Sequence, residues 1–216
     1  MGAIYDATWG RLFAATYDRG SKAMEEAGLR RMRAEVLAEA RGRVIEIGAG
    51  TGANLGLYPG AVTELALTEP SPHMARRLRS HAGGDSRVKV AEAPAERLPY
   101  DDGEFDTAVA TLVLCTVPEP AAAVAELARV LRPDGRLLFL EHVRAPDPDL
   151  ARWQDRLERP WRFLADGCHC NRDTQATLAA SSFELGAVEH SRIPKAPPLV
   201  RPLIRGSARL GANPAG

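Results

Sequence analysis

The stretch Val44-Ile45-Glu46-Ile47-Gly48-Ala49-Gly50-Thr51-Gly52 decides the fold, because it joins a strand pattern directly to a cluster of glycines. A short helical stretch over residues 51–58 is expected to follow. Gly48 and Gly50 lack a Cβ atom, so the backbone there can turn with positive φ and approach a ligand closely. A helix that begins after such a turn presents unpaired N–H groups to a carboxylate or a phosphate. Alone, the pattern also describes a tight turn that holds no ligand.

A second strand makes the ligand-binding interpretation stronger. Residues 63–68, Thr-Glu-Leu-Ala-Leu-Thr, read as a strand that ends at Glu69. An acidic residue about 20 positions after a glycine turn is placed to accept hydrogen bonds from the two hydroxyls of a ribose. The pair of features therefore predicts a nucleoside-containing ligand.

Composition narrows the class of protein. The 216 residues are 45% hydrophobic, which is enough for one domain with a full core over 1–216. Lys plus Arg and Asp plus Glu both number 28, so no basic surface for nucleic acid is expected. No apolar run is long enough to span a bilayer, and the N-terminus lacks the pattern of a secretory signal. The three cysteines, Cys115, Cys168 and Cys170, do not suggest a disulfide framework, so a cytoplasmic location is expected.

Strand and helix patterns alternate along the first two thirds of the chain. This predicts an α/β fold with an open, doubly wound parallel sheet. The expected strands are residues 43–47, 63–68, 87–90, 105–113 and 136–143, and the expected helices include 24–40, 72–81 and 119–131. Residues 105–113 are apolar without alternation, as in a central strand that is buried on both faces.

The last third has a different pattern. Residues 150–164 predict a helix that Pro160 kinks or breaks, and residues 172–181 predict another. Residues 183–193 and 203–210 predict two final strands, which would form an antiparallel hairpin and complete a mostly parallel sheet of seven strands. The N-terminal segment carries four aromatic residues, Tyr5, Trp9, Phe13 and Tyr17. This segment is expected to be either a helix packed on the core or a flap over a substrate pocket.

Four sequence blocks in order resemble a known family. They are residues 46–52, Glu69, the Leu98-Pro99-Tyr100…Asp106 block and residues 131–137. With these blocks, residues 40–145 resemble a class I S-adenosylmethionine (SAM) dependent methyltransferase with a Rossmann-like fold, most similar to the branch around ubiquinone and menaquinone C-methyltransferases. The resemblance implies a helical cap over 1–40, a SAM-binding core over 41–145, and substrate-side helices with the last strands over 146–216.

Further blocks resemble a narrower group, the membrane-anchored alkyl-thiol S-methyltransferases and their soluble bacterial relatives. These blocks are residues 111–117, Glu141-His142-Val143, Asp166-Gly167-Cys168 and Ala196-Pro197-Pro198-Leu199. The anchor that those enzymes carry before the first strand is missing, so no stable membrane anchor is expected. Quinone C-methyltransferases often have a histidine near the position of Cys115, which this chain lacks.

The resemblance implies a set of cofactor contacts. Gly48, Ala49 and Gly50 would hold the methionine part of SAM and of its product S-adenosyl-L-homocysteine. Glu69 would hold the ribose, and Pro70 and Met74 would pack on the adenine. The family's usual Asp-Ala-Glu is Pro94-Ala95-Glu96 here, so Glu96 or a backbone carbonyl would accept from the adenine amino group beside Ala95. The remaining cofactor-binding residues expected are Glu46, Asn54, Thr111 and Leu112.

The same resemblance implies a small-molecule acceptor, with a thiol favoured. Candidates for a base or an orienting group are His142, Asp166 and His169. His142 can equally be a partly buried histidine bonded to backbone, and Asp166 a helix cap or loop-ordering acid. Cys168-His169-Cys170 together with Cys115 lacks the usual spacing of a structural zinc site, so no metal is expected. Cys115 itself is expected on a buried strand, as a small apolar residue that faces the core or the pocket wall.

Three alternatives remain at this point. The acceptor can be a quinol, phenol or amine, with C-, O- or N-methylation. Residues 48–53 also satisfy the G-x-G-x-x-A pattern of a nicotinamide-dependent oxidoreductase. In another class, the chain can be a non-catalytic SAM-binding accessory protein. The expected assembly is a monomer or a homodimer.

Overall fold

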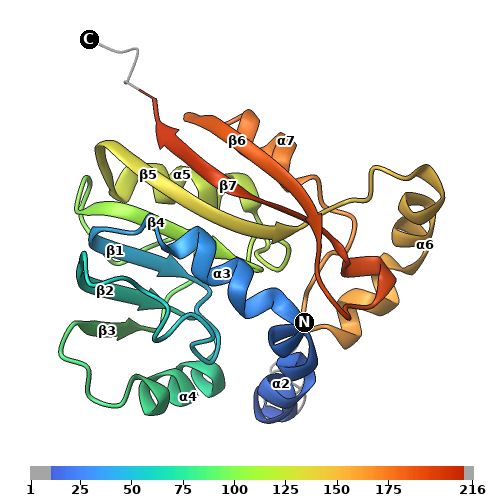
Figure 1. The fold of residues 1–216 in the computed structure, drawn as a ribbon, viewed down its shortest axis with the longest axis horizontal. Coiled ribbons are helices and arrows are strands. Elements are labelled where there is room, and N and C mark those ends of the chain that lie inside the picture. The colour runs from blue at the N-terminus through green and yellow to red at the C-terminus, as the bar shows by residue number, and fades with distance from the viewer. Residues whose placement is uncertain (1–10, 212–216) are drawn as a thin grey trace.

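A computed structural model describes residues 11–211, which form a seven-stranded sheet with helices on both faces (Figure 1). The strand order is β3-β2-β1-β4-β5-β7-β6. The first five strands of this order are parallel, and β7 runs antiparallel to both of its neighbours. The strands are β1 (Gly42–Ile47), β2 (Val62–Thr68), β3 (Val88–Ala91), β4 (Phe105–Thr111), β5 (Leu131–His142), β6 (Phe183–Arg192) and β7 (Pro202–Leu210). The predicted fold class, with its antiparallel C-terminal hairpin, is confirmed.

The sheet separates the hydrophobic core into two layers, one on each of its faces. One layer contains side chains of α3 (Arg30–Leu37) and α4 (Pro72–Ala82), and the other contains side chains of α5 (Pro120–Val130) and α7 (Thr174–Ala179). In Figure 1, α3 crosses in front of the sheet while α5 and α7 lie behind it. The remaining helical elements are α2 (Arg11–Met24), η2 (Glu25–Leu29), α6 (Pro148–Leu164) and η3 (Pro198–Val200).

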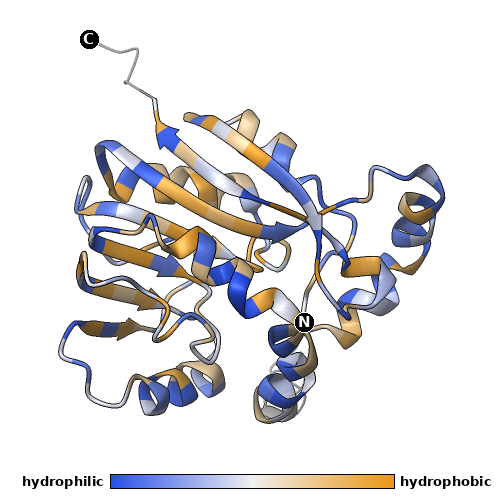
Figure 2. Cartoon of the chain, viewed as in Figure 1, coloured by the Kyte–Doolittle hydropathy of each residue, from blue (hydrophilic) through white to orange (hydrophobic). Residues whose placement is uncertain are grey.

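The central strands are buried on both faces. Ile45, Ile47, Val109 and Leu138 each expose 1% of their surface or less, and Figure 2 shows β1 and β4 as largely hydrophobic. Burial of each such side chain contributes about 1.5–3 kcal/mol to folding. The apolar run that predicted a central parallel strand is therefore explained by its place beside β1 and β5.

Two predicted helices differ from the structure because of glycines. Gly28 has φ +136° inside η2, so the expected continuous helix over 24–40 bends there into η2 and α3. Residues 51–58 form successive turns instead of a helix, since Gly52 and Gly56 have φ of +95° and +76°. Backbone bonds such as Leu55 N to Gly52 O close these turns at 3.0 Å. Helical dihedrals cannot continue through residues held at positive φ.

Other boundaries also differ. The helix expected over 150–164 begins at Pro148 and continues through Pro160 without a break, and the one expected over 172–181 is shortened to α7. Cys115 lies in the turn after β4, not on the strand. Of the N-terminal aromatics, Tyr5 and Trp9 lie outside the described residues, as does the side chain of Phe13. Within residues 11–211, none of the helices has the length and apolar content needed to cross a bilayer.

The strand order indicates at which edge of the sheet a ligand is expected to bind. The chain runs from β1 outward through β2 and β3, then returns to form β4 on the other side of β1. The connections that follow β1 and β4 therefore lead towards opposite edges of the sheet, so its topological switch point lies at the carboxyl ends of these two strands. Open α/β sheets bind their ligands at such a switch point.

Candidate active site

In the glycine turn after β1, Gly48 is closely packed whereas Gly50 faces open space. Gly48 has φ +57°, and a Cβ atom there would lie 2.1 Å from Cγ2 of Val113 in the loop after β4. Gly50 has φ +58°, and a Cβ atom there would meet no atom within 4 Å. Gly48 is therefore required by packing between two loops, whereas Gly50 faces a space that no side chain of the described chain fills.

Glu69 directly follows β2 and lies beside this turn. Its Oε2 accepts from Gly50 N at 2.9 Å, and its Oε1 accepts from Ser71 N at 2.9 Å. Burial raises the pKa of Glu69 above its usual value, although both backbone bonds oppose this, and the charge of Asp166 raises it further. A carboxylate has about four acceptor positions, so each oxygen retains one for a ligand hydroxyl.

A buried hydrogen-bond network lies on the other side of the turn. Asn54 Nδ2 donates to Glu46 Oε1 and to Thr111 Oγ1, both at 2.9 Å. The Tyr58 hydroxyl donates to Glu46 Oε2 at 2.5 Å. Arg33 Nη1 donates to Asn54 Oδ1 at 3.2 Å and to Thr111 Oγ1 at 2.8 Å.

This network attaches the turns after β1 to the sheet. Burial raises the pKa of Glu46, while bonds from Tyr58 and Asn54 and the charge of Arg33 oppose the rise. Arg33 also pairs with Glu25, with Nε 3.1 Å from Oε1. Glu46, Asn54 and Thr111, all predicted from the sequence, are thus brought together by Arg33 and Tyr58, which the sequence argument did not single out.

Helix α2 lies against the glycine turn. Asp18 accepts from the Thr51 hydroxyl at 2.5 Å and from Arg77 Nη2 at 2.7 Å. Partial burial acts to raise the pKa of Asp18, but these two bonds outweigh it and hold the pKa below its usual value. Burial raises the pKa of Tyr17, the residue before Asp18, and the charge of Arg33 opposes this rise.

The other predicted cofactor residues occupy this edge in different ways. Pro70 is exposed just after Glu69, whereas Met74 is buried on α4. Ala95 is buried, and Glu96 accepts from Glu119 N at 3.1 Å, at the N-terminus of α5. Leu112 has φ +55°, a conformation uncommon for a residue with a side chain. Ala49 is buried within the turn.

The end of β5 supplies a buried acid and a buried histidine. Glu141 Oε1 accepts from Val113 N at 3.0 Å and from Leu114 N at 3.1 Å. Burial raises the pKa of Glu141 to about 7, against the opposing effect of these bonds. Its Oε2 is buried without a hydrogen-bond partner among the residues that the structure describes. Glu141 was quoted for the family resemblance but not predicted as a site residue.

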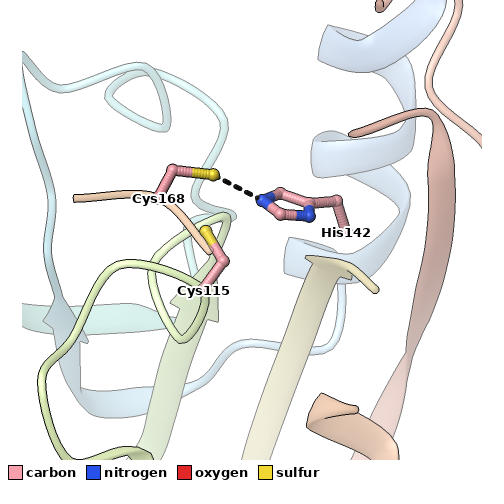
Figure 3. Close-up of side chains that lie close together, drawn as sticks. All are labelled: Cys115, His142 and Cys168. Carbon is pink, nitrogen blue, oxygen red and sulfur yellow. Dashed lines mark hydrogen bonds between the residues drawn. The ribbon is translucent and has the colours of Figure 1, made fainter. Parts of the chain in front are cut away.

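His142 meets two cysteines from distant parts of the sequence (Figure 3). Its Nε2 lies 3.0 Å from Sγ of Cys168, and the ligand atoms of Cys115, His142 and Cys168 all lie within 4.8 Å of one another. A hydrogen bond with Cys168 and burial raise the pKa of Cys115 well above its usual value. Burial acts to lower the pKa of His142, but the interactions with Cys115 outweigh it and raise the pKa.

The loop after α6 separates the remaining candidates. Asp166 has φ +48°, and its charge contributes to the raised pKa of Glu69. His169 Nδ1 lies 2.8 Å from Oε1 of Glu158 on α6, and His169 is not part of the cluster of Cys115, His142 and Cys168. Burial lowers the pKa of His169, and the charge of Arg172 contributes. Cys170 is fully buried and donates to the Gln154 carbonyl at 3.5 Å, outside the cluster.

Comparison with known proteins agrees with this geometry. A family model described as a methyltransferase domain matches residues 45–139. The human thiol S-methyltransferase TMT1B is 37% identical over 173 residues, which cover 76% of this chain and 69% of the relative. Human thiol S-methyltransferase TMT1A is 34% identical over the same shares of the two chains.

Among solved structures, a SAM-dependent methyltransferase from Thermotoga maritima, described as a possible histamine N-methyltransferase, superposes with a TM-score of 0.69. It is 22% identical, and the match covers 97% of this chain and all of that one. At this identity the likeness concerns the fold alone.

The fold and the edge site define a class I SAM-dependent methyltransferase. The chain belongs to the methyltransferase family that contains the human thiol S-methyltransferases, and its cofactor is SAM. It is an enzyme. The two alternatives of a nicotinamide-dependent oxidoreductase and of a non-catalytic SAM-binding protein are therefore set aside.

The buried network generates a stability prediction. Arg33→Met removes the donor to Asn54 and Thr111 and leaves Glu25 without its buried partner. Loss of one partner from a buried, charged network costs about 3–5 kcal/mol, and equilibrium urea unfolding measures it. Arg31→Met, on the same helix, removes an exposed pair with Glu35 and should leave the unfolding midpoint almost unchanged. Equal effects of the two substitutions would contradict the assigned role of Arg33.

Proposed function

We propose that this enzyme transfers the methyl group of SAM to the sulfur of a small-molecule thiol. The observation that supports the acceptor most directly is the similarity to two human enzymes named thiol S-methyltransferases over 76% of the chain. Bound SAM supplies a methyl group on a sulfonium, and its in-line transfer depends mainly on proximity and alignment.

The cofactor side of the proposal rests on two groups. Glu69 has acceptor positions left after its bonds from Gly50 N and Ser71 N, so it suits the two ribose hydroxyls. The space in front of Gly50 suits the methionine part, because a side chain at this position would occupy it. Exposed Pro70 offers an apolar face to the adenine, and Met74 is buried four residues further along the chain, on α4.

The acceptor side lies at the ends of β4 and β5. A thiol has an ordinary pKa near 8.5 and is ionised to a few per cent at neutral pH. For such an acceptor, correct positioning by the enzyme matters more than removal of a proton by a catalytic base. His142, which projects from the end of β5 towards Cys115 and Cys168, is in this proposal the residue beside which the acceptor sulfur binds.

Other features stay predictions. They are the cytoplasmic location, a monomeric or homodimeric state, and the absence of nucleic acid and of a stable membrane anchor among the partners. The contact of α2 with Thr51 supports the hypothesis that the N-terminal aromatic segment is a flap over the substrate pocket.

Glu69 should make cofactor affinity depend on pH. The ionised carboxylate accepts from hydroxyls better than the acid does, and its pKa is raised. Affinity for S-adenosylhomocysteine should therefore fall as the pH is lowered, beginning above the range of an ordinary glutamate near 4.3. Glu69→Ala should weaken binding by roughly 1.5–3 kcal/mol, as for hydrogen bonds to a charged group. Isothermal titration calorimetry across the acid range measures both effects.

The matched control for this experiment is Glu64→Gln. Glu64 lies on the same strand but pairs with Arg43 and Lys89 at the surface, so its replacement should change neither affinity nor its pH dependence. Unchanged affinity in Glu69→Ala would show that the ribose lies elsewhere.

Acceptor choice is the direct test of the proposed function. At fixed SAM, a small thiol should have a higher kcat/KM than an amine or a phenol of the same shape. The rate with the thiol should rise with pH until the acceptor is ionised, since thiolate is the nucleophile. Transfer of a labelled methyl group, with the acceptors in competition, gives the ratio.

An alcohol with the carbon skeleton of the thiol serves as the control, because it matches the thiol in shape and differs only in its nucleophilic atom. Preference for the amine or the phenol would overturn the thiol proposal and leave the methyltransferase assignment intact. Preference for a quinol ring carbon would favour C-methylation instead.

A further inference from the structure

The sulfur and imidazole cluster, Cys115, His142 and Cys168, has the chemistry of a metal site. Its three donors come from the turn after β4, the last residue of β5 and the loop between α6 and α7. The Nε2 of His142 is 3.0 Å from Sγ of Cys168, and the ligand atoms lie within 4.8 Å of one another. Two thiolates and one imidazole form a donor set that selects zinc and similar soft divalent cations.

The cluster is held in place from outside. His169 N donates to the Cys115 carbonyl at 2.9 Å, which joins the loop of Cys168 to the turn of Cys115. Arg172 Nη1 donates to the carbonyls of Leu114 and Val117 at 2.8 and 2.5 Å and fixes the same turn from the other side. The turn of Cys115 and the loop of Cys168 are therefore fixed before any ion binds, and His142 is placed by its position at the end of β5.

The surroundings of Cys168 also suit a metal-bound thiolate. Trp161 Nε1 donates to Sγ of Cys168 at 3.3 Å. Hydrogen bonds of this kind orient metal ligands and stabilise their charge. With two thiolates, a divalent cation makes the cluster neutral overall, so it balances the charge that ionised cysteines would otherwise place in a buried site.

The burial of the three residues is uneven. Cys115 and His142 expose 2% and 4% of their surface, whereas Cys168 is partly exposed. Three protein ligands with one accessible side describe a catalytic zinc site, in which the fourth position takes water or substrate, rather than a closed structural site.

We propose that Cys115, His142 and Cys168 bind one thiophilic divalent cation, zinc in the first instance, whose fourth position receives the acceptor thiol as a thiolate. The site differs from the sequence expectation, which weighed Cys168, His169 and Cys170 together with Cys115, did not include His142 and expected no metal. Its catalytic part rests on the proposed thiol acceptor, whereas metal binding itself does not.

The reaction balances without a further reactant. The acceptor thiol releases its proton to solvent as its sulfur joins the cation. That sulfur then forms the bond to the methyl carbon while the carbon's bond to the sulfonium breaks. The products are a thioether, S-adenosylhomocysteine and one proton. The thioether is neutral and binds the cation more weakly than the thiolate, so it can leave.

The test measures metal binding without turnover. The full chain, purified under anaerobic and reducing conditions, is freed of metal and titrated with Co²⁺. One equivalent should bind and produce a thiolate-to-cobalt charge-transfer band together with intense tetrahedral d–d bands. Cys115→Ser, Cys168→Ser and His142→Gln should each weaken binding by more than about tenfold, since even a group that only orients a ligand contributes about 10–100-fold.

Cys170→Ser is the matched control, because Cys170 lies two residues from Cys168 but bonds to Gln154. It should bind Co²⁺ as the unchanged chain does. Retained affinity for S-adenosylhomocysteine in each variant shows that the domain is folded. Absence of the charge-transfer band, or equal loss in Cys170→Ser, would overturn the metal site.

Acceptor binding separates this inference from the proposed function. Addition of a thiol should shift the cobalt spectrum, while the matching alcohol should not. If Co²⁺ binds but its spectrum does not change when a thiol is added, the proposal that the cation binds the acceptor thiol is wrong. A thiol-dependent shift without methyl transfer would support the site and contradict the proposed function. Full kcat in Cys115→Ser and Cys168→Ser, with loss only in His142→Gln, would make His142 a metal-free base and overturn the inference.

Discussion

The contact between Gly48 and Val113 holds the two halves of the active site together. A Cβ atom at Gly48 would lie 2.1 Å from Cγ2 of Val113, so only a glycine lets the loops after β1 and β4 meet. Because Val113 N also donates to Glu141, this contact links the glycine turn through β4 to the end of β5. The cofactor side and the acceptor side therefore share one packed junction at the switch point of the sheet.

Each side is fixed by partners from elements that are distant in sequence. On the cofactor side, Arg33 of α3 bonds to Asn54 and Thr111, which follow β1 and end β4. On the acceptor side, Arg172 holds the turn that carries Cys115. Polar groups buried in this way must be paired, because an unpaired one costs its full desolvation. The pairing explains why short turns, rather than regular helices, can form a precise site here.

The fold and the cofactor edge were accessible from the sequence for local reasons. Unbroken apolar runs marked the buried strands, and the spacing from the glycines to Glu69 depends on one strand-turn-strand unit. The 51–58 turns were missed because Gly52 and Gly56 adopt positive φ, which the sequence permits but does not require. Arg33, Tyr58 and the grouping of His142 with Cys115 and Cys168 were missed because their partners are adjacent only in the folded chain.

A crystal structure with bound S-adenosylhomocysteine tests the central claim most directly, because it reports both sides of the junction at once. The account predicts that the ribose hydroxyls bond to Glu69, that the amino acid part fills the space before Gly50, and that the sulfur faces the cluster of Cys115, His142 and Cys168. A product whose ribose lies away from Glu69, or whose sulfur faces away from this cluster, would contradict it.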